Sequence, residues 1–199
     1  MRKYFNLFLS VTFWIIMMIG FSDNWLTDVG QPSNSQPKFL IHAFFAFCWF
    51  TLLVVQNGLI KKRNIKGHMK AGKIGFLIYI GFLLTTLPLY LKEFEPLALM
   101  VFSQLIFGTI LIGLGYKNRK TNTLAHKTNV MFGSFLLIQP AWDRTASKMF
   151  GPIGLEWILF FLIFYGLFIW YYKKIKWQFL VGFLIWLAGL TNVIMHMIK

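Results

Sequence analysis

The stretch FLIHAFFAFCWFTLLVVQNGLI (residues 39–60), followed directly by KKRNIKGHMK (residues 61–70), decides the fold class. The first part contains no Asp, Glu, Lys or Arg, and as a helix with a rise of 1.5 Å per residue it is long enough to cross a hydrocarbon core of about 30 Å. The second part is rich in Lys and Arg, which gather on the cytoplasmic side of membrane helices. The stretch therefore predicts a membrane-spanning helix that ends in a cytoplasmic loop.

The composition of the whole chain agrees with this interpretation. Of its 199 residues, 57% are hydrophobic and 13% are charged, whereas soluble domains carry about 25% charged residues. The formal net charge is +14, but the basic clusters lie between apolar runs of membrane-spanning length. We therefore expect the lipid bilayer, and no nucleic acid, as the partner of these charges.

Seven apolar segments predict a single all-α transmembrane domain, a polytopic bundle that covers residues 1–199. The first segment follows Met1-Arg2-Lys3 and lacks a small-x-small cleavage site, so we expect a retained helix. Pro140 is expected to end or kink the fifth segment near its end. The predicted helices cover residues 4–21, 39–60, 73–91, 96–116, 127–142, 153–172 and 177–198.

The charges also predict the orientation. When the loops are assigned alternately to the two sides, fifteen of the 20 Lys and Arg residues fall on the side of the N-terminus, and all 6 acidic residues fall on the other side. The positive-inside rule then predicts a cytoplasmic N-terminus and a C-terminus outside. The fifteen are Arg2, Lys3, Lys61, Lys62, Arg63, Lys66, Lys70, Lys73, Lys117, Arg119, Lys120, Lys127, Lys173, Lys174 and Lys176.

Four histidines are candidate metal ligands. The predicted topology places His42 and His196 near the outer face, and His68 and His126 at the cytoplasmic boundary. The outer and the inner histidines lie roughly 24 Å apart along the helix direction, so an outer and an inner histidine cannot bind the same ion. Bis-imidazole ligation between helices would suit haem b. The alternative is that these histidines are solvated or contact lipid headgroups.

The inner pair fits haem better, because its two members occupy equivalent points of a weak internal repeat. Segments two and three form one hairpin, and segments four and five form another. Each consists of a helix, a basic cytoplasmic loop and a histidine at the entry to the next helix. Both hairpins have the same orientation, as in a parallel repeat.

The second predicted helix carries a polar stripe, formed by His42, Trp49 and Gln56 at intervals of seven residues. This spacing keeps the three side chains close to one helix face. The stripe would line a ligand or quinone pocket, or alternatively pack against a neighbouring helix. Arg144 would hold an anionic group at the outer surface, pair with an acidic residue, or extend into the headgroups.

Several of these residues also carry a resemblance. The run Ile41-His42-Ala43 with Trp49 and Gln56, the run Gly67-His68-Met69-Lys70-Ala71-Gly72, and Ala125-His126-Lys127 followed by Arg144 resemble a group of uncharacterised bacterial inner-membrane proteins. That group shows patterns like H-x6-W-x6-Q, L-H-R-x-L-G and A-H-K-R. The resemblance covers about residues 39–144 and implies a multi-pass protein of the bacterial cytoplasmic membrane. A looser likeness, of layout alone, is to the ascorbate-type di-haem cytochromes b.

Two functional hypotheses follow. In the first, His68 and His126 bind haem b and pass electrons to a redox partner, and the stripe on the second helix lines a second cofactor or quinone site. In the second, the protein is a non-redox carrier of a small solute or an assembly factor, and its histidines are interfacial or handle protons. The sequence contains no nucleophile–base pairing, Walker loop, dinucleotide fingerprint or zincin motif, so it leaves open whether the protein is an enzyme.

Overall fold

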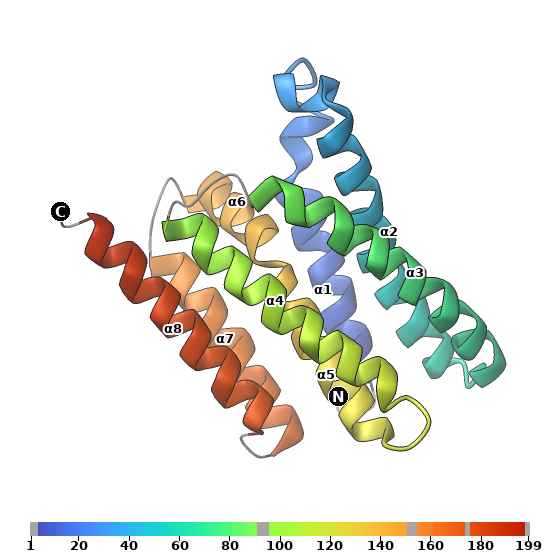
Figure 1. The fold of residues 1–199 in the computed structure, drawn as a ribbon. Coiled ribbons are helices and arrows are strands. Elements are labelled where there is room, and N and C mark those ends of the chain that lie inside the picture. The colour runs from blue at the N-terminus through green and yellow to red at the C-terminus, as the bar shows by residue number, and fades with distance from the viewer. Residues whose placement is uncertain (1–3, 91–95, 151–154, 174–175, 198–199) are drawn as a thin grey trace. The chain divides into compact units, whose positions relative to one another are not determined.

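The computed structural model describes residues 4–90, 96–150, 155–173 and 176–197, and in these ranges it contains helices and turns but no strand (Figure 1). The all-α prediction is confirmed for this part of the chain. Its residues form eight α-helices and two short 3-10 helices. They divide into two compact units, residues 1–89 and 90–199.

The first unit contains three long helices. They are α1 (Phe5–Gly20), α2 (Pro37–Lys61) and α3 (Ile65–Tyr90), with the 3-10 helices η2 (Ser22–Asn24) and η3 (Pro32–Ser35) between α1 and α2. Pro37 suits the first turn of α2, where a missing N–H removes no helical hydrogen bond. The turn from α2 to α3 is tight, and Arg63 adopts a positive φ of 58° there.

Polar side chains join α1 to α2. The Trp14 indole donates a hydrogen bond to the Thr51 hydroxyl at 3.0 Å, and the Asn57 amide donates to the Ser10 hydroxyl at 3.2 Å. Ser10 is fully buried on α1. Hydrogen bonds between helices satisfy polar groups that lipid could not satisfy.

Glycines of α3 make room for large side chains of α2. A side chain at Gly75 would meet Leu52, and a side chain at Gly81 would meet the ring of Phe45. Both glycines therefore leave space that a residue of α2 fills, as the small residues at membrane helix interfaces do.

The second unit is built around a buried helix. It contains α4 (Pro96–Lys117), α5 (Thr123–Leu137), α6 (Gln139–Phe150), α7 (Leu155–Tyr172) and α8 (Trp177–Met197). Helix α5 is buried along almost its whole length from Thr128 to Leu137. It packs against α4, and α4 also packs along α8. Aromatic rings complete the core, with Phe132 in contact with Phe168 and Phe179.

The fifth predicted segment is two helices. Helix α5 begins at Thr123 and ends at Leu137, and α6 begins at Gln139, where the sequence had predicted one helix over residues 127–142. Pro140 explains the break, because it has no N–H to donate to the carbonyl four residues earlier and its ring crowds that carbonyl, whereas the first turn of a new helix tolerates a proline. The eight helices of the described residues thus exceed the predicted seven, since residues 139–150 were expected to lie partly in a loop.

The third helix begins earlier than predicted, at Ile65 instead of residue 73. Its first two turns carry Lys66 and Lys70. Lysine is a good helix former, so hydropathy located the apolar part of this helix and missed its polar start. The predicted helix ends at Leu91, Ile153 and Ile198 lie outside the described residues.

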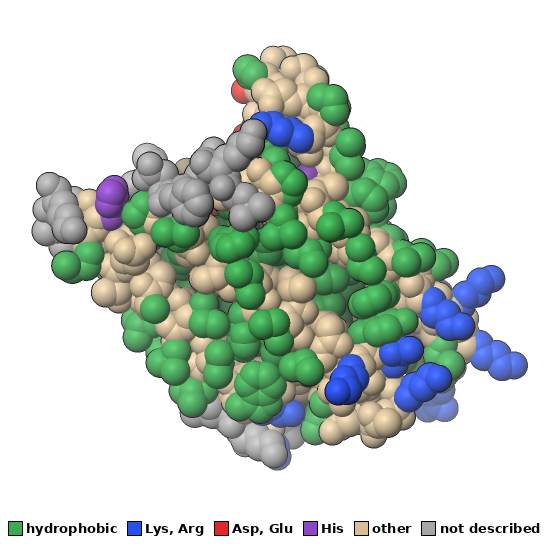
Figure 2. Space-filling model, in the orientation of Figure 1, with side chains coloured by type: hydrophobic (Ala, Val, Ile, Leu, Met, Phe, Trp, Pro, Cys, Tyr) green, Lys and Arg blue, Asp and Glu red, His purple; other side chains and the backbone are tan. Residues whose placement is uncertain are grey.

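Four of the described helices are long and apolar enough to cross a membrane: α2, α3, the part of α4 from Ala98 to Lys117, and the part of α8 from Trp177 to His196. Helix α1 and residues 158–172 are apolar but shorter. Large apolar side chains point outward, such as Leu77 and Leu84 on α3, which are 68% and 61% exposed. Figure 2 shows hydrophobic side chains over much of the visible face. These features are compatible with an integral membrane protein.

Charge separates along the first unit. Exposed Lys and Arg side chains gather where α2 joins α3 (Figure 2), namely Lys61, Lys62, Arg63, Lys66 and Lys70. Asp23 and Asp28 lie at the other end of α2, in the connection from α1. A membrane protein with its basic end in the cytoplasm would have this polarity.

Candidate functional site

Two histidines occupy equivalent positions at the starts of α3 and α5. The Asn64 side chain accepts a hydrogen bond from the Gly67 N–H at 2.8 Å, and the Asn122 side chain accepts from the Ala125 N–H at 2.9 Å. Asparagine is among the best residues for capping a helix N-terminus. His68 and His126 each follow their capping asparagine by four residues, and each donates its backbone N–H to the carbonyl of that asparagine.

A glycine follows each of these histidines by seven residues, close to two helical turns, and so lies near the same helix face. Gly75 of α3 packs against Leu52 of α2, and Gly133 of α5 packs against the backbone of Gly108 in α4. The shared pattern Asn-x3-His-x6-Gly therefore places each histidine on the face turned toward the preceding helix of its hairpin.

The ring of His126 is oriented by the backbone of α4. Its Nδ1 lies 2.9 Å from the carbonyl oxygen of Gly115. A carbonyl can only accept a hydrogen bond, so Nδ1 carries the proton and Nε2 has the lone pair in the neutral ring. This arrangement is usual for metal-binding histidines, whose second ring nitrogen donates to a carbonyl or carboxylate.

Electrostatics favour the neutral form of His126, which precedes the predicted fifth span. Burial lowers its pKa from the ordinary value of 6.5, the hydrogen bond to Gly115 opposes this shift, and Lys127 and Arg119 add to the lowering. A neutral imidazole is the form that binds a metal.

His42 lies at the other end of the α2–α3 hairpin. Its Nδ1 is 3.2 Å from the Thr86 hydroxyl, and its ring lies 5.4 Å from the Phe82 ring. Thr86 and His68 are eighteen residues apart on α3, which corresponds to about 27 Å along the helix. His42 and His68 are therefore too far apart for one metal ion.

The other two residues of the α2 stripe also face α3. The Trp49 ring packs on Tyr79 with 4.8 Å between centroids, and the Gln56 amide lies beside Gly72. Two buried polar atoms of this stripe, Trp49 Nε1 and Gln56 Oε1, have no hydrogen-bond partner. The stripe thus packs against a helix while retaining unused hydrogen-bonding capacity.

Arg144 lies exposed on α6, within a helix where the sequence predicted the region just beyond one. Within the described ranges no three His, Cys, Asp or Glu side chains come together as a metal cluster. Two-histidine ligation of haem iron needs no such cluster.

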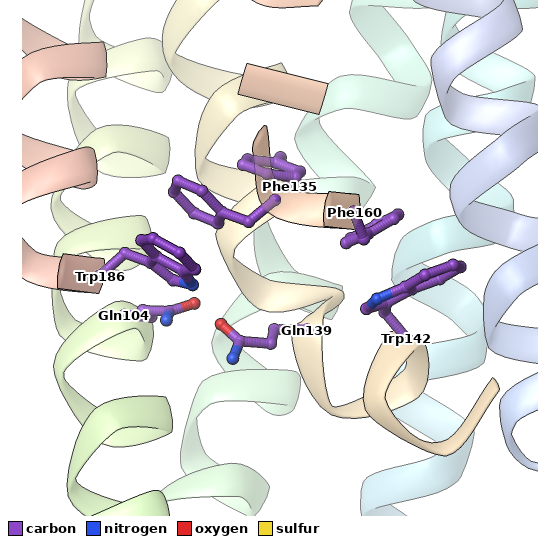
Figure 3. Close-up of a pocket in the computed structure, with 7 residues that line it drawn as sticks. Gln104, Phe135, Gln139, Trp142, Phe160 and Trp186 are labelled. Atoms are coloured by element: carbon purple, nitrogen blue, oxygen red, sulfur yellow. The ribbon is translucent and has the colours of Figure 1, made fainter. Parts of the chain in front are cut away.

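Sequence reasoning missed a second polar site, in the C-terminal unit. A small cavity there is lined by Gln104 of α4, Gln139 and Trp142 of α6, and aromatic rings from α5, α7 and α8 (Figure 3). Gln104 interrupts a strongly apolar helix, which is a signal that the sequence does contain. In the dipeptide Gln139-Pro140, the sequence pattern indicates a structural role only for the proline.

Comparison with known protein families, with curated proteins and with solved structures finds no match for this chain. Its function is therefore argued from its own residues.

Proposed function

We propose that the chain is a multi-pass protein of the bacterial cytoplasmic membrane that binds haem b through His68 and His126 and transfers electrons. The observation that carries this proposal is the orientation of His126, whose Nδ1 donates to the Gly115 carbonyl at 2.9 Å and leaves Nε2 as the metal-binding nitrogen. The bound haem would supply one-electron chemistry.

The repeat supports His68 as the second ligand. Both histidines follow a capping asparagine by four residues, and both face the preceding helix of a tight hairpin. Gly115 fixes the ring of one ligand, and the caps Asn64 and Asn122 fix the first turns that carry both.

The α2 stripe supports a quinone site in the same scheme. Trp49 Nε1 is a donor and Gln56 Oε1 an acceptor, and both are buried without a partner in α2. A quinone that approaches this helix would accept a hydrogen bond from the indole and place its apolar ring against Tyr79. His42, hydrogen-bonded to Thr86, is the outermost residue of the stripe.

The stripe equally supports the rival proposal, a non-redox carrier or assembly factor. Buried polar groups without partners in a membrane helix often mark the path of a polar substrate. In that case the histidines would handle protons or contact headgroups, and the purified protein would contain no haem.

Histidine variants test the proposal. His68→Ala and His126→Ala are each expected to lose most of the haem that co-purifies with the wild type, measured as haem per protein by the pyridine haemochrome assay. His196→Ala is the matched control, because His196 is exposed near the end of α8. Full haem retention in both His68→Ala and His126→Ala would exclude the ligand assignment.

A further inference from the structure

The cavity of the C-terminal unit gathers polar atoms that have no protein partner. Both amide atoms of Gln104, both amide atoms of Gln139 and the indole Nε1 of Trp142 are buried and make no hydrogen bond to the protein. Gln104 and Gln139 are 1% and 5% exposed. Figure 3 shows their amides pointing toward one another across the same space.

These atoms lie where bulk water does not reach. Gln104 is six residues inside the apolar part of α4, which corresponds to about 9 Å along the helix. Trp186, also in the lining, lies near the middle of the apolar part of α8. Uncompensated amides at such a depth are strongly unfavourable, so an occupant that supplies hydrogen bonds is expected.

The walls are aromatic and tightly packed. Trp142 stacks on Phe160 with 3.9 Å between ring centroids, and Phe161 stacks on Trp186 at 4.2 Å. Phe135, at 2% exposed, closes the space from α5. These rings offer no hydrogen bond besides the indole N–H groups, so the two amides determine the chemistry of the occupant.

The size of the cavity restricts its occupant to a very small molecule. Its volume is about 10 Å³, which is enough for about one water molecule. A water molecule donates two hydrogen bonds and accepts two. The site offers two amide oxygens as acceptors, and two amide N–H₂ groups and the indole N–H groups of Trp142 and Trp186 as donors. A carbonyl ligand would leave both amide oxygens unsatisfied.

We propose that Gln104, Gln139 and Trp142 bind one buried water molecule, which links α4 to the junction of α5 and α6. Gln139 is the first residue of α6, next to the break that Pro140 imposes. The water therefore holds α4 against the point where the chain interrupts its helix inside an apolar unit. This site is independent of the proposed haem ligands.

Radiolytic hydroxyl-radical labelling of the purified full-length protein in ¹⁸O water tests the proposal, because radicals formed from a bound water modify adjacent side chains. Phe135 is expected to be labelled several-fold faster than Phe179, which is 0% exposed and does not line the cavity. Equal labelling of Phe135 and Phe179 in the wild type would overturn the proposal.

The double variant Gln104→Leu/Gln139→Leu provides the matched control. Without the amides the cavity retains only indole N–H donors and offers no acceptor to a water molecule, so it is expected to stay dry. Labelling of Phe135 should then fall to the rate of Phe179. An unchanged Phe135 rate in a double variant that retains the wild-type elution profile would show that radicals reach the core by another route, and would also overturn the proposal.

Discussion

The close approach of α4 and α5 depends on the absence of a side chain at Gly133. A Cβ atom there would lie 2.9 Å from the backbone carbonyl oxygen of Gly108 and 2.9 Å from Ile112. A backbone atom in a packed helix pair cannot move aside alone, so Gly133→Ala is expected to push the helices apart and cost about 1–3 kcal/mol of stability. Thermal unfolding in detergent would measure the loss.

Gly113→Ala is the matched control for this prediction, because Gly113 lies on the exposed face of α4 and a Cβ there meets nothing within 4 Å. This substitution is expected to be neutral or slightly stabilising, since alanine favours helix more than glycine does. Equal destabilisation by the two substitutions would contradict the packing described for α4 and α5.

A buried amide pair joins α5 to α8. The Gln178 amide donates to the Asn129 side-chain oxygen at 2.8 Å, and both residues are buried. Gln178→Leu is expected to cost about 0.5–2 kcal/mol, the range for hydrogen bonds between membrane helices. The double variant Asn129→Leu/Gln178→Leu should lose less than the sum of the single changes. Additive losses in denaturant unfolding would show that the two amides are not coupled.

The positions of individual side chains were partly predictable from the sequence. Periodicity placed His42, Trp49 and Gln56 on one face of a helix, and that face does contact α3. The pattern Asn-x3-His is present in the sequence, but it identifies helix caps only when the first residue of each helix is known. The convergence of Gln104 with Gln139 depends on which helices pack together, and a single sequence does not contain that information.

The N-terminus of α3 and the N-terminus of α5 are each capped by one asparagine side chain. Asn122→Ala removes the acceptor for the Ala125 N–H, and it is expected to lower stability by about 0.5–2 kcal/mol. Asn122→Ser should retain most of the stability that the cap contributes, because serine also caps helices. A thermal melt that ranks the two variants alike would contradict the cap, and the same comparison at Asn64 tests the repeat.

Element types were predictable, and element ends were less so. Apolar runs identify the lipid-facing part of a helix, so the polar start of α3 at Ile65 was missed. The proline in the fifth segment predicted a kink or an end, and the structure has an end followed by α6. Nothing local distinguishes a helix that resumes after Pro140 from a loop.

The orientation of the chain in the membrane is a prediction for the whole molecule. In a Cys48→Ser background, a cysteine in place of Ser35, before α2, is expected to react with a membrane-impermeant maleimide in intact cells. A cysteine in place of Thr121, between α4 and α5, should react only after permeabilisation. Both residues are exposed. Labelling of Thr121→Cys alone in intact cells would reverse the predicted topology.

At the scale of the whole molecule, composition predicted the membrane class, because 57% hydrophobic residues exceed what a chain of this length buries. The four described helices that are long and apolar enough to span a membrane are compatible with this prediction. The proposed function was less accessible from the sequence, because a histidine's role depends on the groups that orient its ring. For His126 that group is the carbonyl of Gly115, on a different helix.

The central claim, haem b bound through His68 and His126, is tested most directly by a reduced-minus-oxidised absorption spectrum of the purified wild-type protein expressed with haem supplied. A sharp b-type α band is the predicted result. A flat difference spectrum would contradict the claim and leave the carrier or assembly role.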